Sequence, residues 1–172
     1  FRSKLKTKGA DPQAEAEWVG EVYREIVAIR EQLGLEGPIR YEVDANEGCE
    51  GPWVVAEFLD ALEALDAEAY AALDYLEQPT ERDLGANRWE MAPVARRKPV
   101  LADEGITSLD ELRLATELGW TGPALKTCKG HSLALLEIAW CELTGRPYAL
   151  QDLTNPSIGA VPGEQRRKDA GA

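Results

Sequence analysis

Three short stretches of the chain decide its fold: VDAN (43–46), LEQP (76–79) and ADEG (102–105). Each ends an apolar run, and each carries an acidic residue where that run stops, namely Asp44, Glu77 and Asp103. These acids are 33 and 26 residues apart, close to the roughly 30 residues of one strand-plus-helix unit. If each run is a parallel strand, the three carboxylates lie at the same end of one sheet. Three converging hard oxygen ligands suit Mg²⁺ or a similar cation.

The rest of the chain predicts strands alternating with helices. The expected strands are 3–7, 39–43, 75–76, 100–102, 123–126 and 148–151. The expected helices are 11–33, 52–65, 67–72, 88–95, 108–118 and 132–143. Asp11 and Pro12 are typical of a helix start, and Ser108 with Glu111 forms a capping box. In the first helix, an apolar stripe at helical spacing consists of Trp18, Val22, Ile26, Ile29 and Leu33.

Six strands separated by helical crossovers predict an α/β fold with a parallel sheet and helices outside. We expect a partial (β/α)₈ barrel over residues 1–155, covering about strands two to seven, and a disordered tail over 156–172. In such barrels the functional residues lie at the carboxyl ends of the strands, where the candidate residues fall here. An open doubly wound sheet is the alternative. Against it, the chain has no Gly-rich phosphate loop, and its candidate residues do not gather at one switch point.

The composition excludes several classes of protein. The chain has 172 residues, enough for one domain with a core, and its net charge of −12 argues against nucleic acid or an anionic membrane as a partner. No apolar run approaches the ~20 residues of a membrane span. The three cysteines lack metal-ligand spacing, so we expect reduced thiols in a cytoplasmic protein.

Lysines provide candidate acid and base groups. Lys4 and Lys6 alternate on one expected strand, so both side chains project to the same side. Two ammonium groups close together would lower each other's pKa, which a lysine needs in order to act as a base. The alternative is a solvated basic edge strand. Lys126 ends the expected strand four units further on, across a barrel from Lys6, whereas Lys129 is expected in a loop or at a helix start.

Other chemistry finds less support in the sequence. The single histidine, His131, stands at a helix start, where a capping or surface role is usual. One histidine cannot form a zinc cluster, and no motif supports a Ser-His-Asp triad. Glu104 is a second candidate ligand beside Asp103, although successive strand residues face opposite sides.

Taken together, the motifs resemble those of the enolase superfamily, most of all its mandelate racemase and muconate lactonizing enzyme branch. The resemblance rests on KLK (4–6), DAN (44–46), LEQP (76–79), ADEG (102–105) and ALKTCKG (124–130), in that order and spacing, and covers about residues 1–155. Each motif is weak alone, but the combination is highly specific.

The resemblance implies Mg²⁺-assisted removal of the proton α to the carboxylate of a small carboxylic acid, through an enediolate. It assigns Asp44, Glu77 and Asp103 as ligands of Mg²⁺, with Mn²⁺ as the alternative ion. It assigns Lys6 and Lys126 as acid and base on the two faces of the substrate, with Lys4 lowering the pKa of Lys6. It places Asn46, Glu104 and Asp152 as supporting or substrate-binding residues.

The chain departs from the family pattern in several ways. Relatives have an N-terminal capping domain and a first and an eighth strand, none of which is found here, and Asp-Glu-Gly replaces the commoner Asp-Glu-Ser. Lys126 favours the lysine-pair branch over a His-Asp dyad. Racemisation or epimerisation, cycloisomerisation and dehydration all remain open, and the parent enzyme is expected to be a homo-oligomer.

Two further alternatives remain. One is a truncated or diverged chain that keeps the acidic metal site without turnover. The other is a Schiff-base aldolase with Lys126 as nucleophile, which would leave the three carboxylates without a role.

Overall fold

The computed structural model describes residues 2–151, in which strands and helices alternate as predicted. The elements are β1 (Arg2–Lys6), α1 (Pro12–Gln32), β2 (Arg40–Asp44), α2 (Pro52–Leu65), α3 (Ala67–Ala72), β3 (Leu73–Glu77), α4 (Ala92–Ala95), β4 (Val100–Ala102), α5 (Leu109–Glu117), β5 (Gly122–Lys126), the 3-10 turn η1 (Thr127–Lys129), α6 (His131–Thr144) and β6 (Ala149–Gln151). The expected site residue Asp152 and the expected disordered tail lie outside the described residues.

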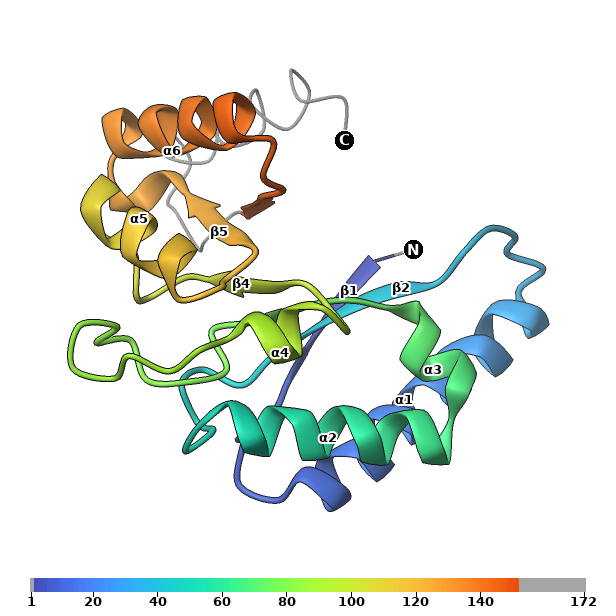
Figure 1. The fold of residues 1–172 in the computed structure, drawn as a ribbon. Coiled ribbons are helices and arrows are strands. Elements are labelled where there is room, and N and C mark those ends of the chain that lie inside the picture. The colour runs from blue at the N-terminus through green and yellow to red at the C-terminus, as the bar shows by residue number, and fades with distance from the viewer. Residues whose placement is uncertain (1, 152–172) are drawn as a thin grey trace.

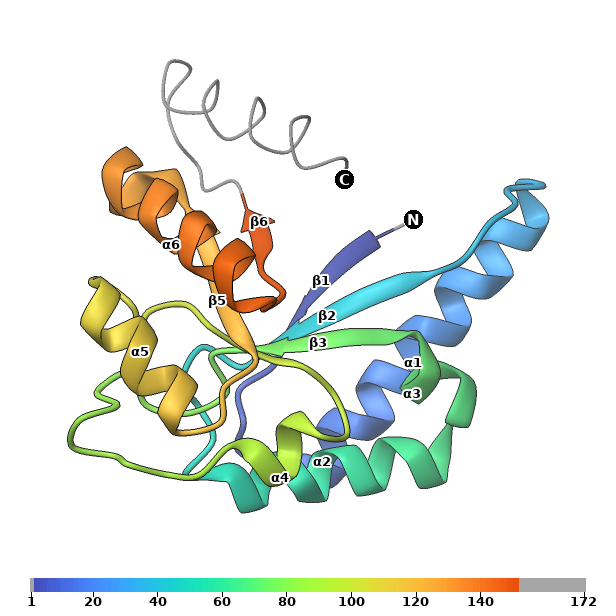
Figure 2. The same cartoon turned by 45° about the horizontal axis from the view of Figure 1, so that its top comes forward.

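The six strands form one parallel sheet in chain order, from β1 to β6. In Figures 1 and 2 the sheet curls, with α1, α2 and α3 on the outer side of β1 to β3 and with α5 and α6 on the outer side of β5. The curl brings the first and last strands together, since the Lys4 ammonium lies 3.1 Å from the Gln151 side-chain oxygen. The predicted partial (β/α)₈ barrel is thus confirmed. The doubly wound alternative is wrong, because such a sheet reverses its strand order.

Local sequence signals place the helix ends as predicted. The Asp11 carboxylate accepts a hydrogen bond from the Ala14 amide at 3.0 Å, and Pro12 occupies the first turn of α1. At α5, the Ser108 hydroxyl accepts from the Glu111 amide at 3.3 Å, and the Glu111 carboxylate accepts from the Thr107 amide at 2.7 Å. These bonds satisfy amide groups that a helix start otherwise leaves unpaired.

Apolar side chains fill the space between the outer face of the sheet and the helices, as Leu59 and Leu62 of α2 do over Val43 and Leu76. The apolar stripe predicted in α1 is only partly buried, because Val22 and Ile26 are half-buried while its other members are exposed. Trp18, Ile29 and Leu33 are 42%, 46% and 65% exposed, whereas Ala16, Val19 and Gly20 are buried. The buried residues of α1 include the small Ala16 and Gly20, so hydrophobic spacing alone did not identify the buried face of the helix.

The expected helix at 88–95 is also shorter than predicted, because only Ala92–Ala95 is helical. Pro93 has no backbone N–H to donate, so it is not tolerated inside a helix that begins at residue 88 but is tolerated in the first turn of α4.

Within residues 2–151, no helix combines the length and the apolar composition needed to cross a bilayer.

Candidate active site

Three buried carboxylates stand at the carboxyl ends of neighbouring strands. Asp44 ends β2 and Glu77 ends β3, and these two residues pair in register. Glu77 pairs with Leu101 of β4, and Asp103 follows β4 directly. Glu77 is fully buried, with 0% of its surface exposed. A buried carboxylate is stable only when ionic or hydrogen-bonding partners compensate its charge, so the partners of these groups define the site.

Lysine side chains from β1 supply two of the partners. The Lys4 ammonium lies 2.7 Å from both oxygens of the Glu77 carboxylate and 3.4 Å from Oδ2 of Asp44. Lys6 forms an ion pair with Asp44 and donates to the side-chain oxygen of Asn46 at 3.0 Å. Lys4 and Lys6 thus project to the same side of the sheet, as predicted.

Two lysines near the end of β5 complete the arrangement: Lys126 is the last residue of β5, and Lys129 lies in the turn η1 that follows. Lys126 forms an ion pair with Asp103 and lies 3.5 Å from Oε1 of Glu77. Lys129 lies 2.8 Å from Oδ1 of Asp103. The charged groups therefore alternate in one chain of contacts: Lys6, Asp44, Lys4, Glu77, Lys126, Asp103 and Lys129. We call this set of seven residues the lysine–carboxylate chain.

Because lysines alternate with carboxylates in this chain, the lysine pKa shifts differ from those expected for neighbouring ammonium groups. Burial lowers the pKa of Lys4, but the Glu77, Glu42 and Asp44 carboxylates outweigh it and raise the pKa above its usual value. Burial likewise lowers the pKa of Lys126, and its contact with Asp103, with Glu77 nearby, outweighs that effect. The expectation that neighbouring lysines depress each other's pKa is therefore wrong for Lys4, because carboxylates lie between the ammonium groups.

Lysine contacts also govern the Asp103 carboxyl. Burial raises its pKa, but hydrogen bonds from Lys126 and Lys129 outweigh that effect and hold the pKa below its usual value. Asp103 is thus an ionised, hydrogen-bonded acceptor in the chain of contacts.

Two of the three expected supporting residues fall within the described part. The Asn46 backbone amide donates to Oδ1 of Asp44 at 3.0 Å, so this residue lies beside the lysine–carboxylate chain. Glu104 is half-buried in the turn after Asp103, and burial together with the Asp103 charge raises its pKa.

Sequence reasoning missed Gln151 as a site residue. The Gln151 side-chain amide donates to the Glu77 carboxylate and, at 3.3 Å, to the Tyr75 hydroxyl, while its oxygen accepts from Lys4. Gln151 pairs in register with Lys126 of the neighbouring strand, and this pairing is known only from the structure. Gln78 was also missed, although it stands inside the LEQP motif.

The donor set fits a hard divalent cation by its chemistry, since it offers three carboxylates at one end of the sheet. Among residues 2–151, however, no three Asp, Glu, His or Cys side chains gather closely enough to ligate an ion together. Lys4 lies between Asp44 and Glu77, and Lys126 lies between Glu77 and Asp103. Cation binding would therefore require these ion pairs to rearrange.

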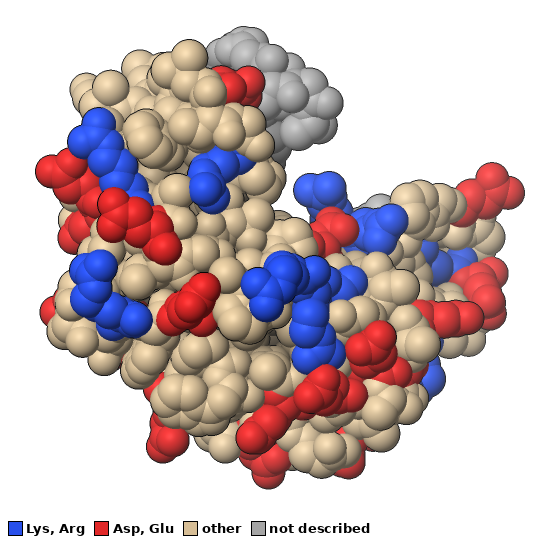
Figure 3. Space-filling model, in the orientation of Figure 1, with Lys and Arg blue, Asp and Glu red and all other residues tan. Residues whose placement is uncertain are grey.

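The hollow of the molecule lies on the concave side of the sheet. Figure 3 shows it between the part that carries α5 and α6 and the strands β1 and β2, with charged side chains of both signs beside it.

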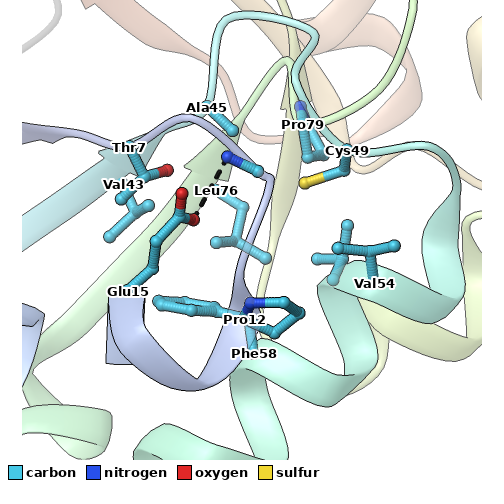
Figure 4. Close-up of a pocket in the computed structure, with 12 residues that line it drawn as sticks. Thr7, Pro12, Glu15, Val43, Ala45, Cys49, Val54, Phe58, Leu76 and Pro79 are labelled. Carbon is cyan, nitrogen blue, oxygen red and sulfur yellow. Dashed lines mark hydrogen bonds between the residues drawn. The ribbon is translucent and has the colours of Figure 1, made fainter. Parts of the chain in front are cut away.

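The cavity in Figure 4 is a different feature: it measures about 20 Å³, room for about one water molecule, and Val43, Ala45 and Leu76 help to line it. These residues alternate with Asp44 and Glu77, so the cavity lies on the helix-covered side.

The curled parallel sheet and the charged residues at its carboxyl edge define a partial (β/α)₈ barrel with a candidate active site in the usual place. Solved structures share this fold. Muconate lactonizing enzyme from Pseudomonas putida matches with a TM-score of 0.68 and 21% identity, over 95% of this chain and 42% of its own. A mandelate racemase/muconate lactonizing protein from Herpetosiphon aurantiacus matches with a TM-score of 0.60 and 26% identity, over 88% and 40%.

A third similar structure is dipeptide epimerase from Cytophaga hutchinsonii complexed with Mg and the dipeptide D-Ala-L-Val, with a TM-score of 0.61 and 22% identity, over 86% of this chain and 36% of its own. No protein-family model and no curated protein matches the sequence. The chain spans about two fifths of the length of these structures. The resemblance to the mandelate racemase and muconate lactonizing enzyme branch of the enolase superfamily is thereby confirmed at the level of the fold.

Proposed function

We propose that the chain is the barrel part of an enzyme that moves the proton α to the carboxylate of a small acid. The observation that carries the proposal is the lysine–carboxylate chain at the carboxyl ends of the strands, in a fold shared with an epimerase and a lactonizing enzyme. Lys6 of β1 contacts Asp44 and Lys126 of β5 contacts Asp103, so these two lysines stand on either side of the central carboxylate Glu77. A proton acceptor and a proton donor on opposite sides of a bound substrate are what α-proton transfer requires.

In this proposal Asp44, Glu77 and Asp103 would hold Mg²⁺, or Mn²⁺ as the alternative ion. When bound, the ion supplies Lewis-acid stabilisation of the negative charge that develops on the substrate. The pKa values of Lys4 and Lys126 would fall if a cation took up the charge of these carboxylates, because the carboxylates are what raise them. Cation binding would thus favour the base form that a lysine needs.

In this proposal the three lysines have different roles. Lys6 and Lys126 would exchange the proton on the two sides of the substrate. Lys4, held at 2.7 Å from the Glu77 carboxylate, would orient that group. The substrate class is a small carboxylic acid, and racemisation or epimerisation, cycloisomerisation and dehydration are the candidate outcomes. D-Ala-L-Val is the first probe to use, since a structure of the same fold holds this dipeptide.

The first test is a Mg²⁺ titration of the full chain by calorimetry, followed by thermal melting. We expect saturable binding and a rise in Tm, both lost in Glu77→Gln because an amide replaces the central carboxylate. Glu57→Gln, a change on the exposed side of α2, is the matched control and should bind as the unchanged chain does. Equal affinity in Glu77→Gln would remove the metal-site assignment.

A second assay follows the Cα deuteration of D-Ala-L-Val in D₂O by NMR. We expect Lys6→Ala and Lys126→Ala each to reduce exchange at least ~100-fold, the lower end of what general acid–base catalysis contributes. Cation binding without exchange of any acid probe would favour a chain that keeps the metal site without turnover. A borohydride-trapped adduct on Lys126 would favour the aldolase alternative.

A further inference from the structure

Gln78 has an unusual backbone conformation at the end of β3, beside the central carboxylate of the candidate site. It follows Glu77 directly, its surface is 0% exposed, and its φ angle is 32°, in the left-handed region that residues with a side chain rarely adopt. The other non-glycine residues with positive φ among residues 2–151 are Asn46 and Glu47, which lie in the turn after Asp44, beyond Ala45. A strained residue persists only where the surrounding structure holds it, and such residues cluster at functional sites.

The side chain of Gln78 holds the turn that carries Asp103. Its Oε1 accepts hydrogen bonds from the backbone amides of Asp103 at 2.8 Å and of Gly105 at 3.1 Å. Its Nε2 donates to the carbonyl oxygen of Thr80 at 2.9 Å. A Cβ atom at position 105 would lie 3.4 Å from this Oε1 and 3.0 Å from the Arg82 carbonyl, so glycine suits the close approach.

The backbone of Gln78 joins two more segments. Its amide donates to the carbonyl of Leu101 in β4 at 2.9 Å, and its carbonyl accepts from the Glu47 amide at 2.8 Å. One buried residue thus links the ends of β2, β3 and β4, the three strands whose ends carry Asp44, Glu77 and Asp103. Side-chain and backbone bonds together over-determine its conformation, which accounts for the persistence of the positive φ angle.

We propose that Gln78 is a positioning residue that sets the separation of the Glu77 and Asp103 carboxylates, and that it thereby controls cation affinity. The inference rests on the proposed function for its consequence, but its structural part stands on the hydrogen bonds alone. Gln78 is adjacent to Glu77 in the chain and bonded to the amide of Asp103, so any shift of its side chain changes the relation between the two carboxylates.

Three variants of the full chain separate positioning from general stability. Gln78→Met keeps the length of the side chain but removes the acceptor of both amides. Gln78→Glu keeps an acceptor oxygen for both amides but loses the donor to the Thr80 carbonyl, so it tests the acceptor separately. Tyr41→Phe is the stability control, because it removes a buried hydrogen bond from the Tyr41 hydroxyl to the Ala69 carbonyl on the outer side of the sheet.

The structural readout is amide hydrogen exchange followed by NMR, without added metal. In Gln78→Met we expect the Asp103 and Gly105 amides to exchange at least tenfold faster, beyond any change shared by all core amides. In Gln78→Glu both amides should stay within threefold of the unchanged chain, and Tyr41→Phe should leave their relative protection as it is. Unchanged exchange of both amides in Gln78→Met would overturn the inference.

The functional readout is the Mg²⁺ and Mn²⁺ affinity by calorimetry. Gln78→Met should weaken binding at least tenfold, while Tyr41→Phe binds within twofold of the unchanged chain. Unchanged affinity in Gln78→Met would overturn the proposal that Gln78 controls cation binding. If the unchanged chain binds neither ion, the proposed function fails on its own, and the amide exchange still decides whether Gln78 positions the Asp103 turn.

Discussion

At the scale of single residues, the site depends on charges that compensate one another. Glu77 is the centre, since it contacts Lys4, Lys126 and Gln151 from three different strands. Glu137 of α6 is a contrasting case, because it is buried and its pKa is raised to about 7 by burial, with Asp103 adding to the rise and Lys129 opposing it. A carboxyl group of this kind stabilises the fold only while it is protonated.

Glu137→Gln should therefore change the pH dependence of stability. A carboxyl whose folded pKa is about 7, against 4.5 in the unfolded chain, binds its proton more tightly when folded, so stability falls as pH rises from about 4.5 to 7. The loss amounts to at most about 3 kcal/mol. Urea unfolding at pH 5 and pH 8 should show a smaller loss of stability in Glu137→Gln than in the unchanged chain. Glu117→Gln, exposed on α5, is the control, and an equal pH dependence in both variants would contradict the assignment.

At the scale of elements, short local signals define where helices begin. The capping box of α5 unites Ser108 and Glu111 in reciprocal contacts, and the Glu111 carboxylate also accepts from the Thr107 amide. α5 follows the Asp103 turn, so its first residue fixes the far end of the segment that carries a candidate ligand. The cap therefore lies at the end of the segment that carries Asp103.

Ser108→Ala should lower the free energy of unfolding by about 1 kcal/mol, because it removes the acceptor of the Glu111 amide. Ser132→Ala is the matched control, since Ser132 is exposed at the start of α6, where no side chain caps the helix. Urea unfolding of both variants measures the difference. Equal stability of the two variants would show that the Ser108 cap contributes nothing.

At the scale of the whole molecule, contacts across the concave face hold the curl of the sheet. Lys4 of β1 contacts Glu77 of β3 and Gln151 of β6, residues 73 and 147 positions away in the sequence. Lys126 of β5 approaches the same Glu77. Side chains from β1, β5 and β6 thus converge on the buried Glu77 carboxylate of β3.

Lys4→Met should lower the free energy of unfolding by about 2–3 kcal/mol, because it leaves the buried Glu77 with weaker compensation. The cost stays at or below the ~3–5 kcal/mol for breaking a fully buried pair, since the Lys4 side chain is 27% exposed and Lys126 remains 3.5 Å away. Adding Glu77→Leu to Lys4→Met should restore part of the loss, because both charges are then gone. A double variant less stable than Lys4→Met would contradict this.

Much of the fold could be predicted from local patterns. Val100–Ala102 was predicted to the residue, and Asp11 and Ser108 mark helix starts as expected. The buried face of α1 could not be predicted, because hydrophobic spacing indicated Trp18 and Leu33 while the structure buries the smaller Ala16 and Gly20. Which side of a helix is buried depends on the shape of its neighbours, and a single segment does not contain that information.

By itself the sequence determined the alternation of strands and helices, and with it the placement of Asp44, Glu77, Asp103 and Lys126 at one edge of the sheet. Strand length and a crossover of about 30 residues suffice for that, because parallel strands all end at the same edge. Only the tertiary structure decided the partners of these groups. The alternation of lysines with carboxylates, and the roles of Gln78 and Gln151, arise from the curl of the sheet, which brings side chains together across distances that local sequence does not encode.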